Sequence, residues 1–128
     1  MSPKDIVSAL FQRWESGDSS DFFASVADDV TWIAIGHTPI SGTSCGKAEY
    51  MKKTYLPLQS VFAGGTSCKV KRIVAEDDVV VVEWHGETPL ATGGVYKNDY
   101  CWVVRVEGGK LAEVTGYFDT AAVNALFA

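Results

Sequence analysis

The stretch that decides the fold is Tyr96–Val106, YKNDYCWVVRV, followed by the turn EGGK and the run Leu111–Asp119. An aromatic and β-branched run, a Gly-Gly turn and a second alternating run together predict a β-hairpin. Alternate residues share one face of a strand. In the first run that face carries Tyr96, Asn98, Tyr100, Trp102 and Val104. Large rings with a single amide suit the wall of an apolar pocket that has one polar fixing point.

Helices precede this hairpin, and further strands lie on either side of it. Apolar spacing predicts helices over residues 4–16 and from about residue 20, a strand over 30–35, a loop over 36–46, and a helix from Lys47 that Pro57 ends or kinks. Strands are predicted over 67–75, 79–87, 95–106 and 111–118, then a short helix over 121–127 with Asp119 as its N-cap. Helices segregated from a long antiparallel meander predict an α+β fold.

Length, charge and cysteine usage narrow the class of protein. A chain of 128 residues predicts a single domain over 1–128. The net charge of −5, with no dense basic face, argues against nucleic acid binding. The first ten residues lack a long apolar core and no run approaches membrane-spanning length, so we expect no membrane partner. Cys45, Cys68 and Cys101 fit neither a disulfide framework nor a metal site, which predicts free thiols in a reducing cytoplasm.

The predicted sheet has apolar residues on both of its faces. The run Val79–Val82 is apolar at both parities, so each face of the sheet needs a cover. The helices can cover one face, and a second copy of the chain is the simplest cover for the other. We therefore expect a homodimer through the sheet face.

Two segments resemble a known family. Residues 32–48, WIAIGHTPISGTSCGKA, resemble the segment W-H-x-P-G-x-x-P-L-x-G-x-x-x-G-x-E of the SnoaL-like polyketide cyclase group. The block Tyr96–Asp119 resembles the same group's Y-x-N-x-Y strand and R-E-Y-x-D ending. The resemblance spans nearly the whole chain and implies the nuclear transport factor 2-like fold, shared with ketosteroid isomerase. That fold is a cone in which a strongly curved antiparallel sheet wraps round N-terminal helices and encloses a deep apolar pocket.

Several ionisable positions of these relatives are replaced in this chain. Ile33 stands where the SnoaL-like pattern has His, and Thr115-Gly116 stands where it has Arg-Glu. In a rough alignment to ketosteroid isomerase the general-base position falls on Ala34, and the oxyanion-hole positions fall near Phe11 and Trp102. Tyr55 is the plausible equivalent of one of the isomerase's pocket tyrosines. We therefore do not expect steroid isomerisation or epoxide hydrolysis by the known sets of residues.

Two histidines are the candidate proton carriers. His85 could be a general base paired to a carboxylate, but its parity with Glu87 and opposite Trp84 favours a surface or interface position. His37 follows Gly36 in the loop at the expected pocket mouth, where it could shuttle protons or be solvated. Asp119 is a poor general acid because a capping carboxylate is stabilised as the anion.

The leading hypothesis is a cofactor-independent isomerase, cyclase or dehydratase that acts on an apolar, carbonyl-containing small molecule. Tyr55, Asn98 and Tyr100 would orient and polarise the substrate oxygen, and His37 or His85 would carry the proton. The rings of the predicted lining suggest a flat or polycyclic ligand. The remaining residues predicted to contact it are Phe11, Trp32, Ala34, Trp84, Trp102, Gly116 and Phe118.

Two alternatives remain open: a non-catalytic binding module for an apolar small molecule, and a dimerising protein–protein module. The enzyme needs a titratable group within about 3 Å of a bound oxygen, and a cavity lined only by rings and amides would contradict it. Small-molecule binding needs a cavity of at least roughly 300 Å³. A protein–protein module needs an exposed apolar patch beyond the dimer surface.

Overall fold

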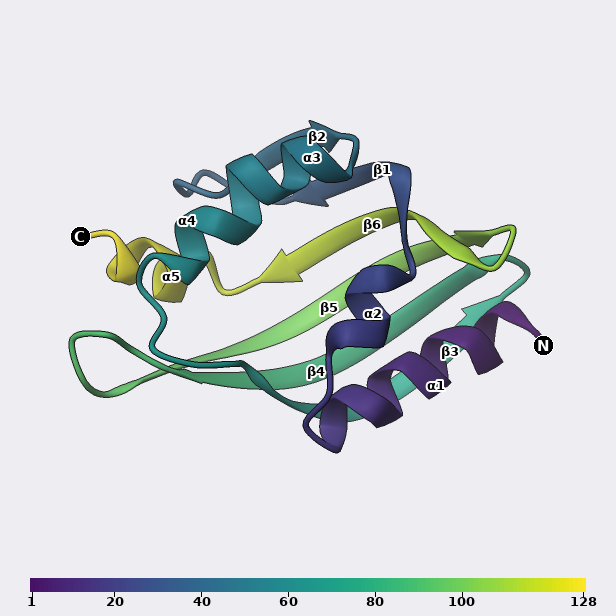
Figure 1. Cartoon of the computed structure of the whole chain (residues 1–128), viewed down its shortest axis with the longest axis horizontal. Helices are drawn as coiled ribbons and strands as arrows, with labels where there is room; N and C mark the ends of the chain where they lie inside the picture. The colour runs from purple at the N-terminus through teal and green to yellow at the C-terminus, as the bar shows by residue number, and fades with distance from the viewer.

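A computed structural model describes all 128 residues (Figure 1). Helices and strands are segregated along the chain, which confirms the predicted α+β class. In chain order the elements are α1 Pro3–Glu15, α2 Ser20–Ala24, β1 Val26–Ala34, β2 Gly42–Cys45, α3 Lys47–Tyr50, the π-helical turn Met51–Tyr55, α4 Leu56–Gln59, β3 Ser67–Glu76, β4 Val79–Pro89, β5 Val95–Glu107, β6 Lys110–Phe118 and α5 Thr120–Leu126.

The N-terminal helix α1 has a complete start signal. The Ser2 side chain accepts a hydrogen bond from the backbone N–H of Asp5, the Asp5 carboxylate accepts one from the backbone N–H of Ser2, and Pro3 occupies the first turn. Its apolar face buries Val7, Leu10 and Phe11. Figure 1 shows α1 and α2 lying across one side of the sheet; α1 contacts β3 and β4, and α2 contacts α1 and β1. No helix of the structure is long and apolar enough to cross a membrane.

The sheet has six strands in the order β2-β1-β6-β5-β4-β3. Strands β3 to β6 form the predicted antiparallel meander, but β1 pairs with β6 in parallel, so the sheet is mixed rather than purely antiparallel. The segment predicted as a loop over 36–46 contains the short strand β2, which adds to the edge of β1. Strand β1 also begins at Val26, with Asp28 and Asp29 inside it rather than in a turn.

The two faces of β5 follow the predicted alternation. Tyr96, Asn98 and Val104 are buried, whereas Lys97 and Asp99 are exposed. Strand β5 lies between β4 and β6, so its inward residues stand opposite inward residues of both neighbours. One cross-strand row runs through Val82, Trp102, Gly116 and Ala34, and the next through Trp84, Tyr100 and Phe118. These two rows form the inner surface against which the site is built.

A π-helical turn joins α3 to α4, and Pro57 gives it a physical cause. Proline has no backbone N–H, and its ring crowds the carbonyl four residues before it. The backbone N–H of Leu56 reaches back five residues to the Met51 carbonyl instead of four. The helical segment therefore continues past Pro57 with a local π turn, where the sequence predicted an end or a kink.

Candidate functional site

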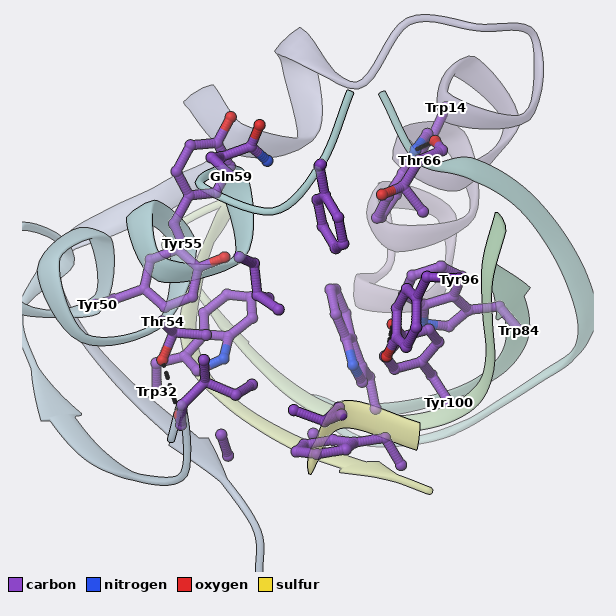
Figure 2. A pocket seen from close by; sticks show the side chains of 18 residues that line it. Trp14, Trp32, Tyr50, Thr54, Tyr55, Gln59, Thr66, Trp84, Tyr96 and Tyr100 are labelled. Atoms are coloured by element: carbon purple, nitrogen blue, oxygen red, sulfur yellow. Dashed lines mark hydrogen bonds between the residues drawn. The ribbon is translucent and has the colours of Figure 1, made fainter. Parts of the chain in front are cut away.

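The inner face of the curved sheet and the segment α3–α4 enclose an aromatic cavity of about 150 Å³ (Figure 2). Fourteen of its 18 lining residues are hydrophobic. The lining contains no carboxylate, imidazole, amine or guanidinium group. Its members are Trp14, Trp32, Ala34, Ile40, Tyr50, Thr54, Tyr55, Leu58, Gln59, Phe62, Thr66, Trp84, Tyr96, Tyr100, Trp102, Gly116, Phe118 and Val123.

Two pairs of close rings form opposite walls of the cavity. On one wall Trp32 and Tyr50 lie with ring centroids 4.0 Å apart. On the other, Trp84 and Tyr100 stack with centroids 4.2 Å apart and planes 13° apart. Figure 2 shows the first pair on the left and the second on the right. Both walls present flat aromatic surface toward the same space.

The indole of Trp102 stands between these two walls. It meets Trp32 at 5.3 Å and Trp84 at 5.0 Å between centroids, and it is nearly perpendicular to both. Beneath it lies Gly116, its cross-strand partner on β6. A Cβ atom at position 116 would lie 3.1 Å from the indole Nε1, so the missing side chain makes room for the ring.

A short chain of hydrogen bonds runs along β5 on the Trp84 wall. The Asn98 amide donates to the Tyr96 hydroxyl at 2.7 Å, and the Tyr96 and Tyr100 hydroxyls are 3.0 Å apart. Asn98 also donates to the Asp119 carbonyl and accepts from the Asp119 N–H. Asn98 thus anchors the two phenols to the start of α5. The Tyr100 hydroxyl is the last group in this series of hydrogen bonds.

The facing wall offers a phenol as well. Figure 2 shows the Tyr50 hydroxyl pointing into the cavity, and no protein group hydrogen-bonds to it. Thr54, one helical turn later, is occupied because its hydroxyl donates to the Ile40 carbonyl. Gln59 is the exposed residue of the lining and marks the side on which the cavity meets solvent. The unpaired hydroxyl of Tyr50 therefore lies inside the cavity, and the Gln59 amide lies at its rim.

Burial keeps these phenols protonated. Desolvation raises the pKa of Tyr50 and that of Tyr100, and the neighbouring Tyr96 adds to the rise at Tyr100. Desolvation also raises the pKa of Tyr96, although its hydrogen bonds to Tyr100 and Asn98 oppose the rise. At physiological pH all three are neutral hydroxyls that can donate a hydrogen bond.

One buried polar side-chain atom has no hydrogen-bond partner, and it belongs to this site. It is the indole Nε1 of Trp84, a residue only 3% exposed. Its counterpart Trp14 differs, because the Trp14 Nε1 donates to the Thr66 carbonyl at 2.9 Å. Buried donors are normally paired. The Trp84–Tyr100 wall therefore contains a buried N–H donor that lacks a hydrogen-bond acceptor.

The structure places the two predicted proton carriers, His85 and His37, outside the lining of the cavity. His85 points to the outer face of the sheet, where its ring nitrogens lie 2.9 Å from an Asp99 oxygen and 2.8 Å from a Glu87 oxygen. These hydrogen bonds, Asp99 first, raise the pKa of His85. His37 is exposed and is not part of the lining. Strand parity explains the position of His85, since it alternates with the inward Trp84 and Gly86.

The predicted contact residues fall into two groups. The structure places eight of them in the lining, and these are Trp32, Ala34, Tyr55, Trp84, Tyr100, Trp102, Gly116 and Phe118. Phe11 is fully buried behind the lining, with its ring 6.2 Å from that of Trp102. Asn98 also lies behind the lining, because its amide is used by Tyr96 and Asp119. Asp119 caps α5, as predicted, by accepting from the Ala121 N–H.

Sequence reasoning missed several lining residues. Tyr96 shares the inward parity of Tyr100, so its signal was present in the strand pattern. Tyr50 and Gln59 come from the helical segment, where each lies four residues from another lining residue, Thr54 and Tyr55 respectively, so their signal was present in the helix spacing. Trp14 packs against Phe11 on the apolar face of α1 and also lines the cavity.

The size of the cavity corrects the expected ligand. A volume of about 150 Å³ is below the roughly 300 Å³ that we expected of a small-molecule site. A polycyclic molecule therefore does not fit this structure. An apolar cavity of about 150 Å³ is large enough for a molecule the size of benzene. The lining of rings, hydroxyls and one amide contains no carboxylate or imidazole that could take up a proton near neutral pH.

The fold has many relatives of known structure. A nuclear transport factor 2-like protein from Burkholderia thailandensis is 20% identical over 100% of this chain and 98% of its own, with a TM-score of 0.79. TerC, co-crystallised with polyporic acid, is 23% identical over 98% of each chain, with a TM-score of 0.76.

A protein from Catenulispora acidiphila with a ketosteroid isomerase-like fold, in complex with trimethylamine, is 15% identical over 98% of this chain and 93% of its own, with a TM-score of 0.71. No curated protein matches the sequence. The SnoaL-like domain model matches residues 7–114. These likenesses confirm the cone-shaped fold that the sequence predicted. The chain belongs to the SnoaL-like domain family.

Proposed function

We propose that this protein binds a small apolar molecule, about one ring in size, that carries a neutral oxygen acceptor such as a carbonyl. The observation that carries the proposal is the pairing of flat aromatic walls with protonated phenols, Tyr50 on one wall and Tyr100 on the other. The rings supply apolar contact area. A hydrogen bond from a hydroxyl then fixes the orientation of the ligand.

The hydrogen-bond chain on β5 favours Tyr100 as the donor. Tyr96 accepts from the Asn98 amide, and either phenol can donate in the 3.0 Å bond between Tyr96 and Tyr100; in the proposed arrangement Tyr96 is the donor. Tyr100 then keeps its proton free for a ligand oxygen. Each bond polarises the next, so the last hydroxyl becomes a stronger donor.

Catalysis is the second candidate, and the same phenols favour it. Neutral donors aimed at a carbonyl stabilise the negative charge that develops on its oxygen during isomerisation, cyclisation or dehydration. The lining has no side chain to take up a proton, so a substrate that turned over would pass its proton to water or between its own groups. Tyr50 and Tyr100 would then be polarising residues, and neither histidine would take part.

A methylated amine is the competing ligand class. The faces of tryptophan and tyrosine attract a cation, the lining has no positive charge to repel one, and a relative of the same fold was solved in complex with trimethylamine. The Trp84 N–H and the Tyr50 hydroxyl, which have no protein partner, argue against this class, because a cation accepts no hydrogen bond. The neutral acceptor therefore accounts for more of the site.

The test is a titration of the purified protein with acetophenone, ethylbenzene and tetramethylammonium, followed by calorimetry and thermal unfolding. We expect acetophenone to bind about tenfold tighter than ethylbenzene, the difference that one good hydrogen bond of about 1.4 kcal/mol makes. Tyr100→Phe should remove that difference, and Tyr117→Phe, at an exposed position on β6, should not. NMR of the recovered ligand shows whether any of it has reacted.

Two results would overturn the proposal. Stabilisation by tetramethylammonium alone would support the methylated amine instead. If the folded protein does not bind acetophenone, a neutral one-ring molecule is excluded as the ligand class. An NMR spectrum showing that the recovered ligand has reacted with the wild type but not with Tyr100→Phe would show that the protein is a catalyst rather than a binding protein.

The predicted homodimer through the outer sheet face stays a proposal. That face exposes Tyr117 at 49% and Val74 at 56%, both large apolar side chains. Sedimentation velocity of the wild type and of Tyr117→Lys tests it: we expect a dimer for the wild type and a monomer for the variant. A wild type that sediments as a monomer at high concentration would exclude the homodimer.

A further inference from the structure

The aromatic cavity is small although its lining is long. Eighteen residues surround a volume of only about 150 Å³. They come from elements at both ends of the sheet, from Trp14 on α1 to Val123 on α5. A side chain that projects between the walls would reduce the volume in this way, and Trp102 is the one so placed.

Trp102 has ring neighbours on every side of the cavity. Its centroid lies between 5.0 and 6.2 Å from six other rings, which are those of Phe11, Trp14, Phe22, Trp32, Trp84 and Tyr100. It is T-shaped to the Trp32 wall at 84° and to the Trp84 wall at 87°. Trp102 therefore stands upright between two walls that face each other.

The cross-strand row that holds Trp102 has small residues next to it. Gly116 follows on β6 and Ala34 follows on β1, so the sheet beyond the indole carries almost no side-chain volume. Both residues line the cavity, together with Ile40 and Val123 beyond them. The floor over Gly116 and Ala34 is thus a shallow trough. The indole of Trp102 occupies the part of it that lies over Gly116.

We propose that Trp102 is the specificity-determining residue that limits the ligand to a single ring. The inference rests on the proposed binding function and deepens it. The indole divides the space between the Trp32–Tyr50 wall and the Trp84–Tyr100 wall. A shorter side chain at 102 would join the two parts along the trough over Gly116 and Ala34, and a two-ring ligand would then fit.

The position of the indole depends on Gly116. A Cβ atom at 116 would lie 3.1 Å from Nε1 and 3.3 Å from Cδ1 of Trp102, tighter than ordinary contact. Gly116→Ala should therefore push the indole further into the cavity and reduce the space for even one ring. Substitutions at 102 and at 116 are expected to change the cavity volume in opposite directions.

The experiment compares acetophenone with 2-acetylnaphthalene, which has the same carbonyl and one more ring. For the wild type we expect acetophenone to bind at least tenfold tighter. In Trp102→Leu, or in the milder Trp102→Phe should the first variant not fold, the preference should fall at least tenfold. Gly116→Ala should weaken acetophenone. Trp32→Leu is the matched control. It also removes an indole from the lining, but that indole belongs to a wall and does not stand between the two walls.

The outcomes separate the two proposals. Failure of the wild type to bind acetophenone overturns the binding function, and crystal structures of the wild type and Trp102→Leu then still test whether the cavity enlarges. Wild type that already binds 2-acetylnaphthalene as well as acetophenone overturns the role of Trp102. An equal gain of 2-acetylnaphthalene affinity in Trp32→Leu, or a cavity that collapses in Trp102→Leu, overturns it as well.

Discussion

The Tyr96 and Tyr100 hydroxyls lie 3.0 Å apart on β5, within hydrogen-bond distance of each other. Residues four apart on a strand point the same way but stand well apart along it, so these phenols meet because both side chains lean toward the space between them. The Asn98 amide donates to Tyr96 from the residue in between. The alternate positions of one strand thus form a continuous polar line in an apolar wall.

Asn98→Leu should destabilise the fold by about 2–3 kcal/mol. Asn98 is 4% exposed, and its amide serves the Tyr96 hydroxyl and both backbone groups of Asp119. Removing it leaves buried partners without hydrogen bonds, which costs more than the bonds themselves contribute. Urea unfolding measures the change. Lys97→Leu, on the exposed face of the same strand, is the control and should stay within about 0.5 kcal/mol of wild type.

Gly86→Ala should destabilise the Trp84–Tyr100 wall by about 1–3 kcal/mol. An added Cβ would lie 2.8 Å from Cζ3 of Trp84 and 3.2 Å from Cε2 of Tyr100, and both rings are held by packing. Gly65→Ala is the matched control, because a Cβ at 65 has nothing within 4 Å. Thermal unfolding distinguishes the two, and equal melting temperatures would show that the wall adjusts freely.

His85 should make the stability of the protein depend on pH. Its hydrogen bonds to Asp99 and Glu87 raise its pKa in the folded state, above the roughly 6.5 of an unfolded chain. The stabilisation is then complete below about pH 6.5 and is lost as pH rises through the folded-state pKa. The melting temperature of wild type minus that of His85→Gln should fall as pH rises from about 6.5.

The control for this effect is His37→Gln, whose ring contacts no charged group in the structure. A wild-type minus His85→Gln difference that stays constant with pH would show that the hydrogen bonds to Asp99 and Glu87 do not depend on protonation. His85 is more than one-third exposed, so solvent screening limits the size of the effect.

The three cysteines should react with a thiol reagent at different rates. Cys45 is exposed, whereas Cys68 is buried and desolvation raises its pKa to about 12. The thiolate is the reactive form, so at pH 8 Cys45 should be labelled first and Cys68 only on unfolding. Mass spectrometry of labelled peptides over time measures the order. Rapid labelling of Cys68 in the folded protein would contradict the burial of that thiol.

The inner surface of the sheet was predictable because strand alternation is a local property. Parity alone put Tyr100 and Trp102 inside and His85 and Asp99 outside. It could not reveal that the Asn98 amide is occupied by Asp119, because that contact joins residues 21 apart in the sequence.

Strand β2 and the parallel partner of β1 could not be read from the sequence either. Residues Gly42–Cys45 carry no apolar alternation, and only the exposed edge of β1 gives them a place in the sheet. Parallel pairing leaves no local signal because the two strands are far apart in the chain. The size of the cavity was mispredicted for a related reason: it depends on the tilt of one indole, Trp102, over one glycine.

The parallel pairing of β1 with β6 has a consequence for synthesis on the ribosome. Within the sheet, strand β1, Val26–Ala34, can pair only with the short β2 until Lys110–Phe118 has been made. Contacts between such distant segments form late and slowly. The edge of β1 that pairs with β6 must then stay without its hydrogen-bond partner while most of these residues are made. The nascent chain is therefore most open to aggregation or to chaperone binding shortly before its last strand is released.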